Sequence, residues 1–248
     1  MEVHHHAHTE RKKWTHYFWE FFMLFLAVTL GFIVENQREH YVEHQREKQF
    51  LQSLVNDIKG DTVKLGAIIQ RRIAREHHLD SMQYLMNYSD TVNHTNEIYF
   101  YAVSAARSLL IRFVPNDGTM QQLKNSGAFR LIRNRTVADS IAKYDVSVRN
   151  YVRQLEIEEL LINDYRGAAA KMFNSLVFDQ MLDENNNVSK LPPGNPPLLP
   201  YNKTDLYDWN YKLSSMKNLN KANRRDGRLL LLQAKGLLEL LNKEYHLD

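Results

Sequence analysis

Residues 17–34 read YFWEFFMLFLAVTLGFIV, and this stretch decides how the rest of the chain is interpreted. It carries a single charge, Glu20. As an α-helix these residues span about 27 Å, and residues 14–16 extend the helix to about 31 Å, close to the thickness of the hydrocarbon core of a bilayer. Aromatic side chains expected at a membrane interface gather at its N-terminal end, namely Trp14, Tyr17 and Trp19. We therefore predict a transmembrane helix over residues 14–34.

Two other interpretations of this stretch are a buried core helix and a cleaved signal peptide. A core helix seldom carries five Phe within fifteen residues, directly preceded by Lys and Arg, as this one does. A cleaved signal peptide ends in small residues of the A-x-A type, and no such site follows the apolar run. The pattern favours an uncleaved signal anchor.

The orientation of the helix depends on the basic residues beside it. Three Lys or Arg precede the span at residues 11–13, and three follow it, Arg38, Arg46 and Lys48. The first three form one compact block next to the membrane, and this proximity breaks the tie. We therefore expect residues 1–13 to be a cytoplasmic tail and residues 35–248 to lie outside. In a bacterium with two membranes, this places the anchor in the inner membrane and the C-terminal domain in the periplasm.

One face of the predicted span combines a carboxylate with small residues. Glu20, Ala27 and Gly31 fall within about 40° of each other at 100° per residue. Ala27 and Gly31 form a small-xxx-small pair that allows two helix backbones to approach closely, and an acidic group avoids lipid. We expect this face to join protomers of a homo-oligomer, or to contact a larger membrane complex. The alternatives are that Glu20 extends to the interface while the small residues are incidental, or that Glu20 serves a proton or ion pathway.

The remainder of the chain predicts helices and no strands. No proline occurs before Pro115, so the membrane helix can continue to a stop at residues 87–90, with kinks expected at Gly60 and Gly66. The other helices are expected at 95–113, 119–126, 128–134, from 136 to a stop at 183–187, and at 204–245, with 191–200 as a proline-rich crossover. The predicted fold is all-α: one N-terminal transmembrane helix continuing into an elongated helical-bundle ectodomain of four main helices over residues 35–248.

The third long helix has apolar residues at helical spacing, which predicts its buried face. These core positions are Val137, Ile141, Tyr144, Val148, Val152, Leu155, Ile162, Tyr165, Ala169 and Phe173.

Composition narrows the possible functions. The chain has 248 residues, is 44% hydrophobic, and has a net charge of +3, which is too balanced to indicate nucleic-acid binding. It contains no cysteine, which excludes disulfides, thiolate metal sites and cysteine nucleophiles. We therefore expect a lipid bilayer as a partner, no nucleic acid and no cofactor.

Two histidine-containing segments are candidate metal sites. Residues 40–44, HYVEH, match H-x-x-E-H, in which His40 and His44 would bind zinc and Glu43 would act as the base. The alternative is a solvated juxtamembrane helix with charged side chains at i,i+4 spacing. The N-terminal tail holds a second cluster, which could bind a transition metal or serve as a cationic tail near anionic lipid headgroups: His4, His5, His6 and His8.

Four basic residues lie close together in the middle of the chain, namely Lys124, Arg130, Arg133 and Arg135. They could bind an anionic ligand or partner. The alternative is a solvated helix end.

Two segments carry a resemblance to a known family. The run HHHAHTERKKWTHYFWEFFMLFLAVTLGFIVENQREHYVEHQREKQFLQSLVNDIKGD and the stretch MQQLKNSGAFRLIRNRTVADSIAKYD resemble a family of single-pass Bacteroidota membrane proteins described only as a domain of unknown function. The resemblance covers most of the chain and is most specific at the His-rich N-terminus. It implies a bacterial inner-membrane protein and supplies no activity, substrate or catalytic residue.

Three hypotheses for function follow. The first is a non-enzymatic, membrane-anchored envelope protein that acts as an oligomeric scaffold or accessory subunit. The second is a sensor or ligand-binding helical ectodomain; its cytoplasmic part of about 13 residues is too short for an output domain, so it would signal through a membrane partner. The third is a zinc-dependent enzyme at the HxxEH segment.

Overall fold

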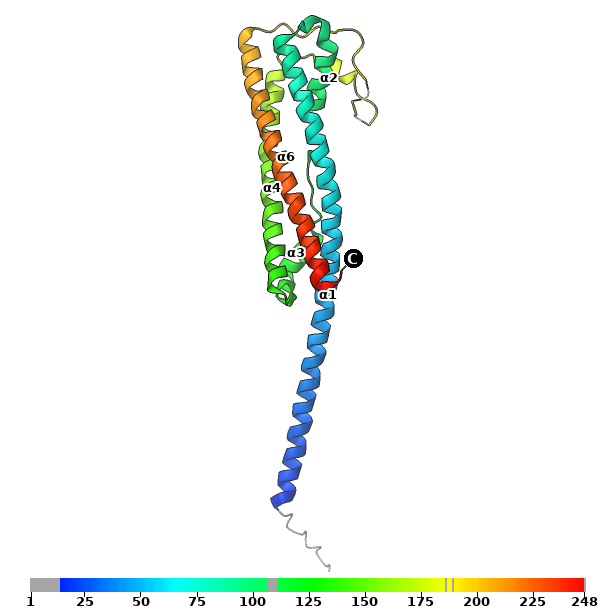
Figure 1. Cartoon of the computed structure of the whole chain (residues 1–248), viewed down its shortest axis with the longest axis vertical. Helices are drawn as coiled ribbons and strands as arrows, with labels where there is room; N and C mark the ends of the chain where they lie inside the picture. Colours follow the sequence, from blue (N-terminus) through cyan, green and yellow to red (C-terminus); the bar gives the residue numbers. More distant parts are fainter. Residues whose placement is uncertain (1–13, 107–110, 186, 189, 248) are drawn as a thin grey trace, which may run out of the picture. The chain divides into compact units, whose positions relative to one another are not determined.

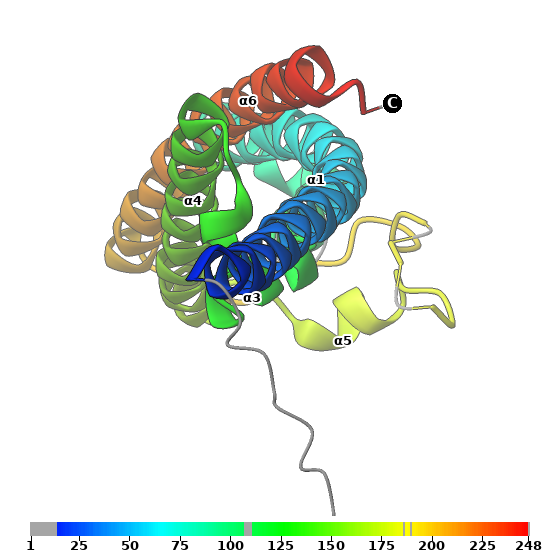
Figure 2. The same cartoon turned by 90° about the horizontal axis from the view of Figure 1, so that it is seen from below.

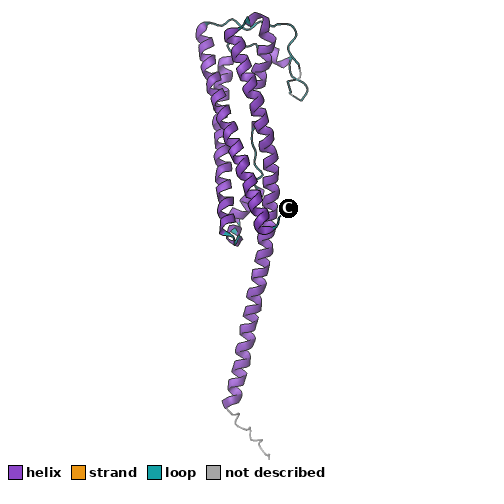
Figure 3. Cartoon of the chain, viewed as in Figure 1, coloured by secondary structure: helices purple, strands orange, loops and turns teal. Residues whose placement is uncertain are grey.

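The computed structural model describes residues 14–106, 111–185, 187–188 and 190–247. Within these residues every regular element is a helix, and the only pairing of β type is an isolated bridge between Leu182 and Val188 (Figure 3). The first helix, α1 (Trp14–Tyr88), is long and begins with the apolar stretch. The predicted all-α fold with a long apolar N-terminal helix is confirmed.

The chain divides into two units, Met1–Gln49 and the compact unit Phe50–Asp248. The described part of the first unit is a single helical segment, the first half of α1, and nearly all its side chains from residue 14 to 46 are exposed. All other helices belong to the compact unit, which we call the bundle.

Three long helices run side by side in the bundle: residues 50–88 of α1, α4 (Arg135–Ala169) and α6 (Lys203–Tyr245) (Figures 1 and 2). At one end the C-terminal part of α1 meets η1 (Thr91–His94), α2 (Thr95–Ala105) and α5 (Ser175–Asp179). At the other end lie α3 (Gly118–Asn125) and η3 (Ala128–Leu131). The bundle therefore has three full-length helices, and shorter elements complete its two ends.

Asparagine caps define where the long helices begin. The side chain of Asn134 accepts a hydrogen bond from the backbone N–H of Val137 at the start of α4. At the start of α6, Asn202 and Asp205 form a reciprocal capping box, with N···O distances of 3.0 and 3.3 Å. Each pair satisfies backbone groups that the first helical turn leaves without partners. These caps place the starts of α4 and α6 within a residue of the sequence prediction.

The predicted helix over 95–113 is too long, because α2 ends at Ala105. Residues 112–117 have no helical structure, although Ile111 and Phe113 are buried. Pro115 favours an extended conformation at Val114, the residue before it. Lys64 of α1 then holds this segment by donating hydrogen bonds to the carbonyl oxygen of Val114, at 2.9 Å, and to the side chain of Asn116. The predicted helix is therefore wrong for residues 112 and 113, which belong to this non-helical segment.

The predicted stop of the third long helix at 183–187 is also wrong, because α4 ends at Ala169. A turn follows, and Asn174 caps the short helix α5 by accepting a hydrogen bond from the N–H of Leu176. The carbonyl oxygen of Met172 accepts a hydrogen bond from the N–H of Leu199, 2.9 Å away, in the proline-rich segment. Contacts with a segment distant in sequence therefore hold the turn open where local propensity would allow the helix to continue.

α1 continues through both Gly60 and Gly66, the positions where kinks were expected. Gly60 has a packing role instead, since a β-carbon there would lie 2.5 Å from Nδ2 of Asn116. The glycine gives the extended segment room to lie close to α1.

The apolar core consists of two separate clusters. One cluster gathers side chains from residues 51–68 of α1, 113–151 and 230–241. The other gathers side chains from residues 79–86 of α1, 98–105, 162–181 and 209–216. Each of the three long helices contributes to both clusters, and on each helix one or two residues between the clusters are buried but polar. These polar residues form the candidate functional site.

Candidate functional site

A layer of buried polar side chains crosses the bundle between its two apolar clusters. Its members, which we call the polar layer, are at most 4% exposed: Arg72 and Arg75 of α1, Glu158 of α4, and Asn220 and Asn223 of α6. On α1, residues 72 and 75 are three apart and so share one face of the helix. At this level the three long helices therefore meet through polar side chains, charged on α1 and α4 and neutral on α6.

Glu158 is the centre of the polar layer. Its carboxylate accepts two hydrogen bonds from Arg72, with distances of 3.0 Å from Nη1 to Oε1 and 2.8 Å from Nη2 to Oε2. It also accepts one from Nη1 of Arg75 at 2.9 Å and one from Nδ2 of Asn223 at 2.8 Å. A carboxylate offers about four acceptor positions, so these donors saturate it.

These contacts determine the charge states of the layer. Burial by itself would raise the pKa of Glu158, but the hydrogen bonds and charge of Arg72, with help from Arg75 and Asn223, keep it below its ordinary value. Burial lowers the pKa of Arg75 to about 10, against the opposing attraction of Glu158. Near neutral pH the layer therefore contains an ionised glutamate and two guanidinium cations.

Asn220 links the layer to a second ion pair nearer the surface. Its Oδ1 accepts a hydrogen bond from Nη1 of Arg72 at 2.9 Å, and its Nδ2 donates to the carbonyl oxygen of Arg72 at 3.0 Å. Nδ2 also lies 3.4 Å from Oε1 of Glu76, which accepts a hydrogen bond from Nε of Arg224 at 2.8 Å. Three arginines thus face two glutamates, and the connected network carries a net charge of about +1.

Several polar atoms of the layer have no hydrogen-bond partner among the described residues. They are Nε of Arg72, Nε of Arg75 and Oδ1 of Asn223, and all three atoms are inaccessible to solvent. Buried polar groups are usually paired, so these two donors and one acceptor leave hydrogen-bonding capacity unused in the layer.

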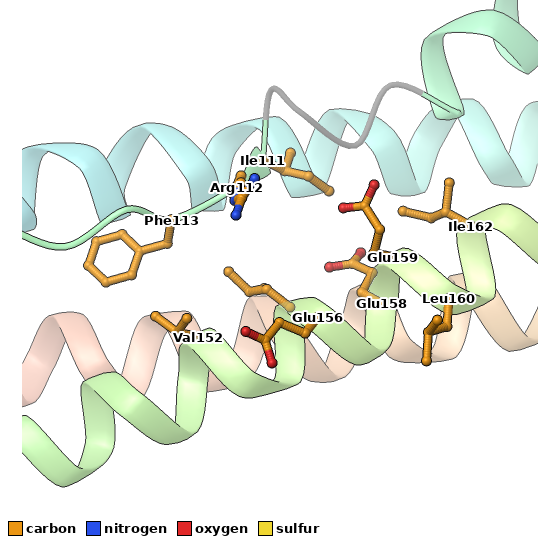
Figure 4. Close-up of a pocket in the computed structure, with 10 residues that line it drawn as sticks. Ile111, Arg112, Phe113, Val152, Glu156, Glu158, Glu159, Leu160 and Ile162 are labelled. Atoms are coloured by element: carbon orange, nitrogen blue, oxygen red, sulfur yellow. The ribbon is translucent and has the colours of Figure 1, made fainter.

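A cavity of about 380 Å³ lies on one side of the layer. α4 and residues 111–113 form its walls, and Glu158 and Glu159 project from α4 towards these residues (Figure 4). Glu156 and Arg112 also line this cavity, so its described polar lining is mainly acidic.

A second cavity, of about 350 Å³, is lined by residues of α1 and α2 together with Ile111. Its polar lining consists of Arg71, Arg75, His78, Ser104 and Asn187, with no carboxylate among the described lining residues. Burial lowers the pKa of His78 below its ordinary value of 6.5, and the nearby His77 lowers it further. His78 is therefore mainly neutral at pH 7. The charged groups that line the two cavities are therefore of opposite sign, mainly negative in the first and positive in the second.

Sequence reasoning missed the polar layer, although a signal was present. Arg72 and Arg75 lie beside the periodic apolar positions of α1, and Glu158 lies between Leu155 and Ile162, which were predicted to be core residues. A charge within an apolar stripe indicates a buried polar pair. Its partner could not be identified from sequence, because Arg72 and Glu158 are 86 residues apart.

The predicted oligomer face lies on the exposed surface of α1. Glu20 and Ala27 line one open groove of about 580 Å³ together with His16, Trp19, Met23 and Leu24. Nε2 of His16 lies 3.3 Å from Oε1 of Glu20. Gly31 is exposed but does not line the groove, and a β-carbon there would meet no atom within 4 Å. The structure thus places two of the three predicted residues in one groove.

The two histidines of the HxxEH segment each pair with a glutamate three residues further along the same helix. Nδ1 of His40 is 3.8 Å from Oε2 of Glu43, and Nδ1 of His44 is 3.0 Å from Oε2 of Glu47. His40 and Glu43 are both exposed. Across residues 14–106, 111–185, 187–188 and 190–247, no three His, Cys, Asp or Glu side chains are grouped so that they could hold a metal ion. The other predicted metal residues, His4, His5, His6 and His8, lie outside the described residues.

The predicted basic cluster divides into two parts. Nζ of Lys124 forms an ion pair of 2.6 Å with the carboxylate of Asp145, which also pairs with Arg149 at 3.0 Å. Arg130, Arg133 and Arg135 are exposed around η3 and the start of α4. Lys124 therefore has a structural contact within the bundle, and the three arginines are the remaining candidates for an anionic partner.

Comparison of the chain with known protein families, with curated proteins and with solved structures returned no match. The resemblance to a Bacteroidota membrane family therefore stays a prediction from the residues.

Proposed function

We propose that this protein is a single-pass, non-enzymatic envelope protein that acts as an oligomeric scaffold or as an accessory subunit of a larger membrane complex. One observation carries the proposal. α1 is the one helix of the described chain that is long and apolar enough to cross a membrane, and none of its most apolar 18-residue window is buried within the protein. A contiguous apolar surface of this size is unfavourable in water and indicates a lipid or protein partner.

The placement in the membrane rests on the basic residues beside the span. The Arg-Lys-Lys block at residues 11–13 favours a cytoplasmic N-terminus, and the bundle is then periplasmic in a bacterium with an inner and an outer membrane.

Single-cysteine labelling tests this orientation without background, because the chain has no cysteine of its own. Lys243→Cys, at an exposed position near the end of α6, should react with a membrane-impermeant maleimide in intact spheroplasts. Thr9→Cys in the tail should react only after lysis. The reverse pattern would contradict the proposed orientation, and recovery of the protein in the soluble fraction after cell breakage would contradict the anchor.

Assembly is proposed to occur along the face that carries Glu20, Ala27 and Gly31. Gly31→Leu should reduce the oligomer size of detergent-purified protein in mass photometry, because the larger side chain prevents close approach of the helices. The matched control is Thr29→Leu, about 180° away around the same helix. If Gly31→Leu leaves the size unchanged, or if both variants reduce it equally, this face is not the interface.

The polar layer favours a second candidate function, a ligand-binding bundle that signals through a membrane partner. Replacing buried charge pairs by apolar residues is often neutral or stabilising, so stability alone does not require these pairs. Here the charges lie beside two cavities that a small molecule could enter. A ligand would be expected to raise the unfolding temperature of the purified full-length protein and to alter cross-linking between copies. Ligand binding with no change in cross-linking would argue against signalling.

A further inference from the structure

The network around Glu158 has more positive than negative charge. Arg72 and Arg75 share the single carboxylate of Glu158, and at the edge of the network Arg224 pairs with Glu76. Arg72 and Arg75 are 0% and 4% exposed, so water screens their charge poorly. An uncompensated buried cation is costly, which indicates that a further anion would stabilise this region.

The cavity lined by α1 and α2 has the charge needed to receive that anion. Arg75 contributes to both the polar layer and the wall of this cavity, and Arg71 lines the same cavity from the surface. Ser104 and the neutral ring of His78 add groups that can donate hydrogen bonds. The cavity lined by Glu156, Glu158 and Glu159 has the opposite character and would repel an anion.

The remaining walls of the cavity define the rest of the ligand. Phe100, Ile111, Val188 and Ala74 provide apolar surface, and the volume of about 350 Å³ suits a small organic molecule. The ring of His78 packs against those of Phe100 and Tyr101, with centroids 5.7 and 5.6 Å away, which holds the imidazole at the cavity wall. A ligand with one charged end and one apolar end matches this arrangement better than an inorganic ion does.

We propose that this cavity binds a small organic monocarboxylate, with its carboxylate near Arg71 and Arg75 and its apolar part against Phe100 and Ile111. Guanidinium groups recognise carboxylates through short, charge-assisted hydrogen bonds, which gives the charged end its selectivity. The proposal supplies a ligand class for the second candidate function and rests on that function. It is independent of the membrane anchor.

Isothermal titration calorimetry on the full-length protein in nanodiscs tests the proposal. The probes are butyrate and benzoate at constant ionic strength, with butyramide and benzamide as neutral analogues of similar shape and inorganic phosphate as an anion without an apolar part. The carboxylates should bind at least about tenfold more tightly than their amides and more tightly than phosphate. Equal affinity for acid and amide, or binding of phosphate alone, would overturn the proposal, as would no binding by either carboxylate.

Variants locate the site. Arg71→Gln removes an exposed charge from the cavity wall, and Ser104→Leu fills the cavity; each should weaken butyrate binding about tenfold or more. The control is Arg153→Gln, an exposed arginine of α4 that does not line this cavity, which should leave affinity unchanged. Unaltered unfolding temperatures without ligand show that the variants are folded.

Butyrate binding that survives both cavity variants would place the ligand elsewhere and overturn the assignment. The cysteine-labelling and mass-photometry experiments test the membrane anchor and the oligomer independently. A failure of carboxylate binding would therefore not contradict the proposed envelope scaffold.

Discussion

Arg72 and Glu158 form a two-pronged ion pair between α1 and α4, in which the side chains are 0% and 4% exposed. Because Glu158 also binds Arg75 and Asn223, one carboxylate connects all three long helices. Such an arrangement costs desolvation energy when it forms and is expensive to break from one side only. Its removal should therefore affect the whole bundle.

Glu158→Gln should destabilise the bundle by about 3–5 kcal/mol, because two buried arginines then have no anionic partner within the polar layer. Urea unfolding of the full-length protein in detergent, followed by tryptophan fluorescence that includes the buried Trp209, measures this change. Glu156→Gln, an exposed glutamate one half-turn earlier, is the control and should change stability by less than about 0.5 kcal/mol. Equal effects of the two substitutions would contradict the central role of Glu158.

The same residue predicts a pH dependence. The pKa of Glu158 lies below its ordinary value of 4.5 in the folded protein, so the folded state favours the carboxylate. Its contribution to stability is complete above about pH 4.5 and is lost as the pH falls through the lower folded pKa. The unfolding free energy of the wild type should thus fall more steeply below pH 4.5 than that of Glu158→Gln, measured by urea unfolding between pH 3 and pH 7. Parallel curves would show that the carboxylate is not stabilised by folding.

Gly227→Ala should destabilise the bundle by about 1–3 kcal/mol through overpacking. A β-carbon at this position of α6 would lie 2.8 Å from the hydroxyl oxygen of Tyr151 and 3.3 Å from its Cζ. Gly236→Ala on the same helix meets no atom within 4 Å and should instead be stabilising by about 0.5–1 kcal/mol. Thermal unfolding compares the two, and addition of Tyr151→Phe should restore part of the loss. No recovery in the double variant would mean that the clash lies elsewhere.

Asn202→Ala should lower the unfolding free energy by about 1 kcal/mol, because it removes the capping box at the start of α6. Asn242→Ala, at an exposed position in the last turn of the same helix, is the matched control and should have little effect. Chemical denaturation monitored by circular dichroism distinguishes them. If both substitutions cost the same, the cap contributes nothing particular to α6.

Local sequence signals predicted those parts of the fold that local interactions determine. The bounds of α6, the end of α3 before Gly127 and most core positions of α4 agree with the prediction. Gly127 has a φ of 66°, a left-handed conformation that favours glycine and ends a helix. Of the ten predicted core positions of the third helix, Val152 and Leu155 are only partly buried, and the others are buried.

The parts that were not predicted depend on contacts between distant residues. α2 ends at Ala105, and the segment around Val114 is held against α1 by Lys64; α4 ends at Ala169, and Met172 bonds to the proline-rich segment. The candidate site has the same origin. Asn220 and Arg72 are 148 residues apart, so only the folded bundle reveals that an asparagine, an arginine and a glutamate belong together.

The polar layer also has a mechanical consequence for the bundle. Arg72 and Arg75 lie about one helical turn apart. If α1 slid along α4 by one turn, about 5.4 Å, one arginine would take the other's place, and an apolar side chain such as Ile68 or Leu79 would replace the second arginine beside Glu158. Sliding in either direction would thus cost Glu158 one of its two buried guanidinium partners. The layer therefore favours one register of the three helices. Leaving that register requires the ion pairs of Glu158 to open first.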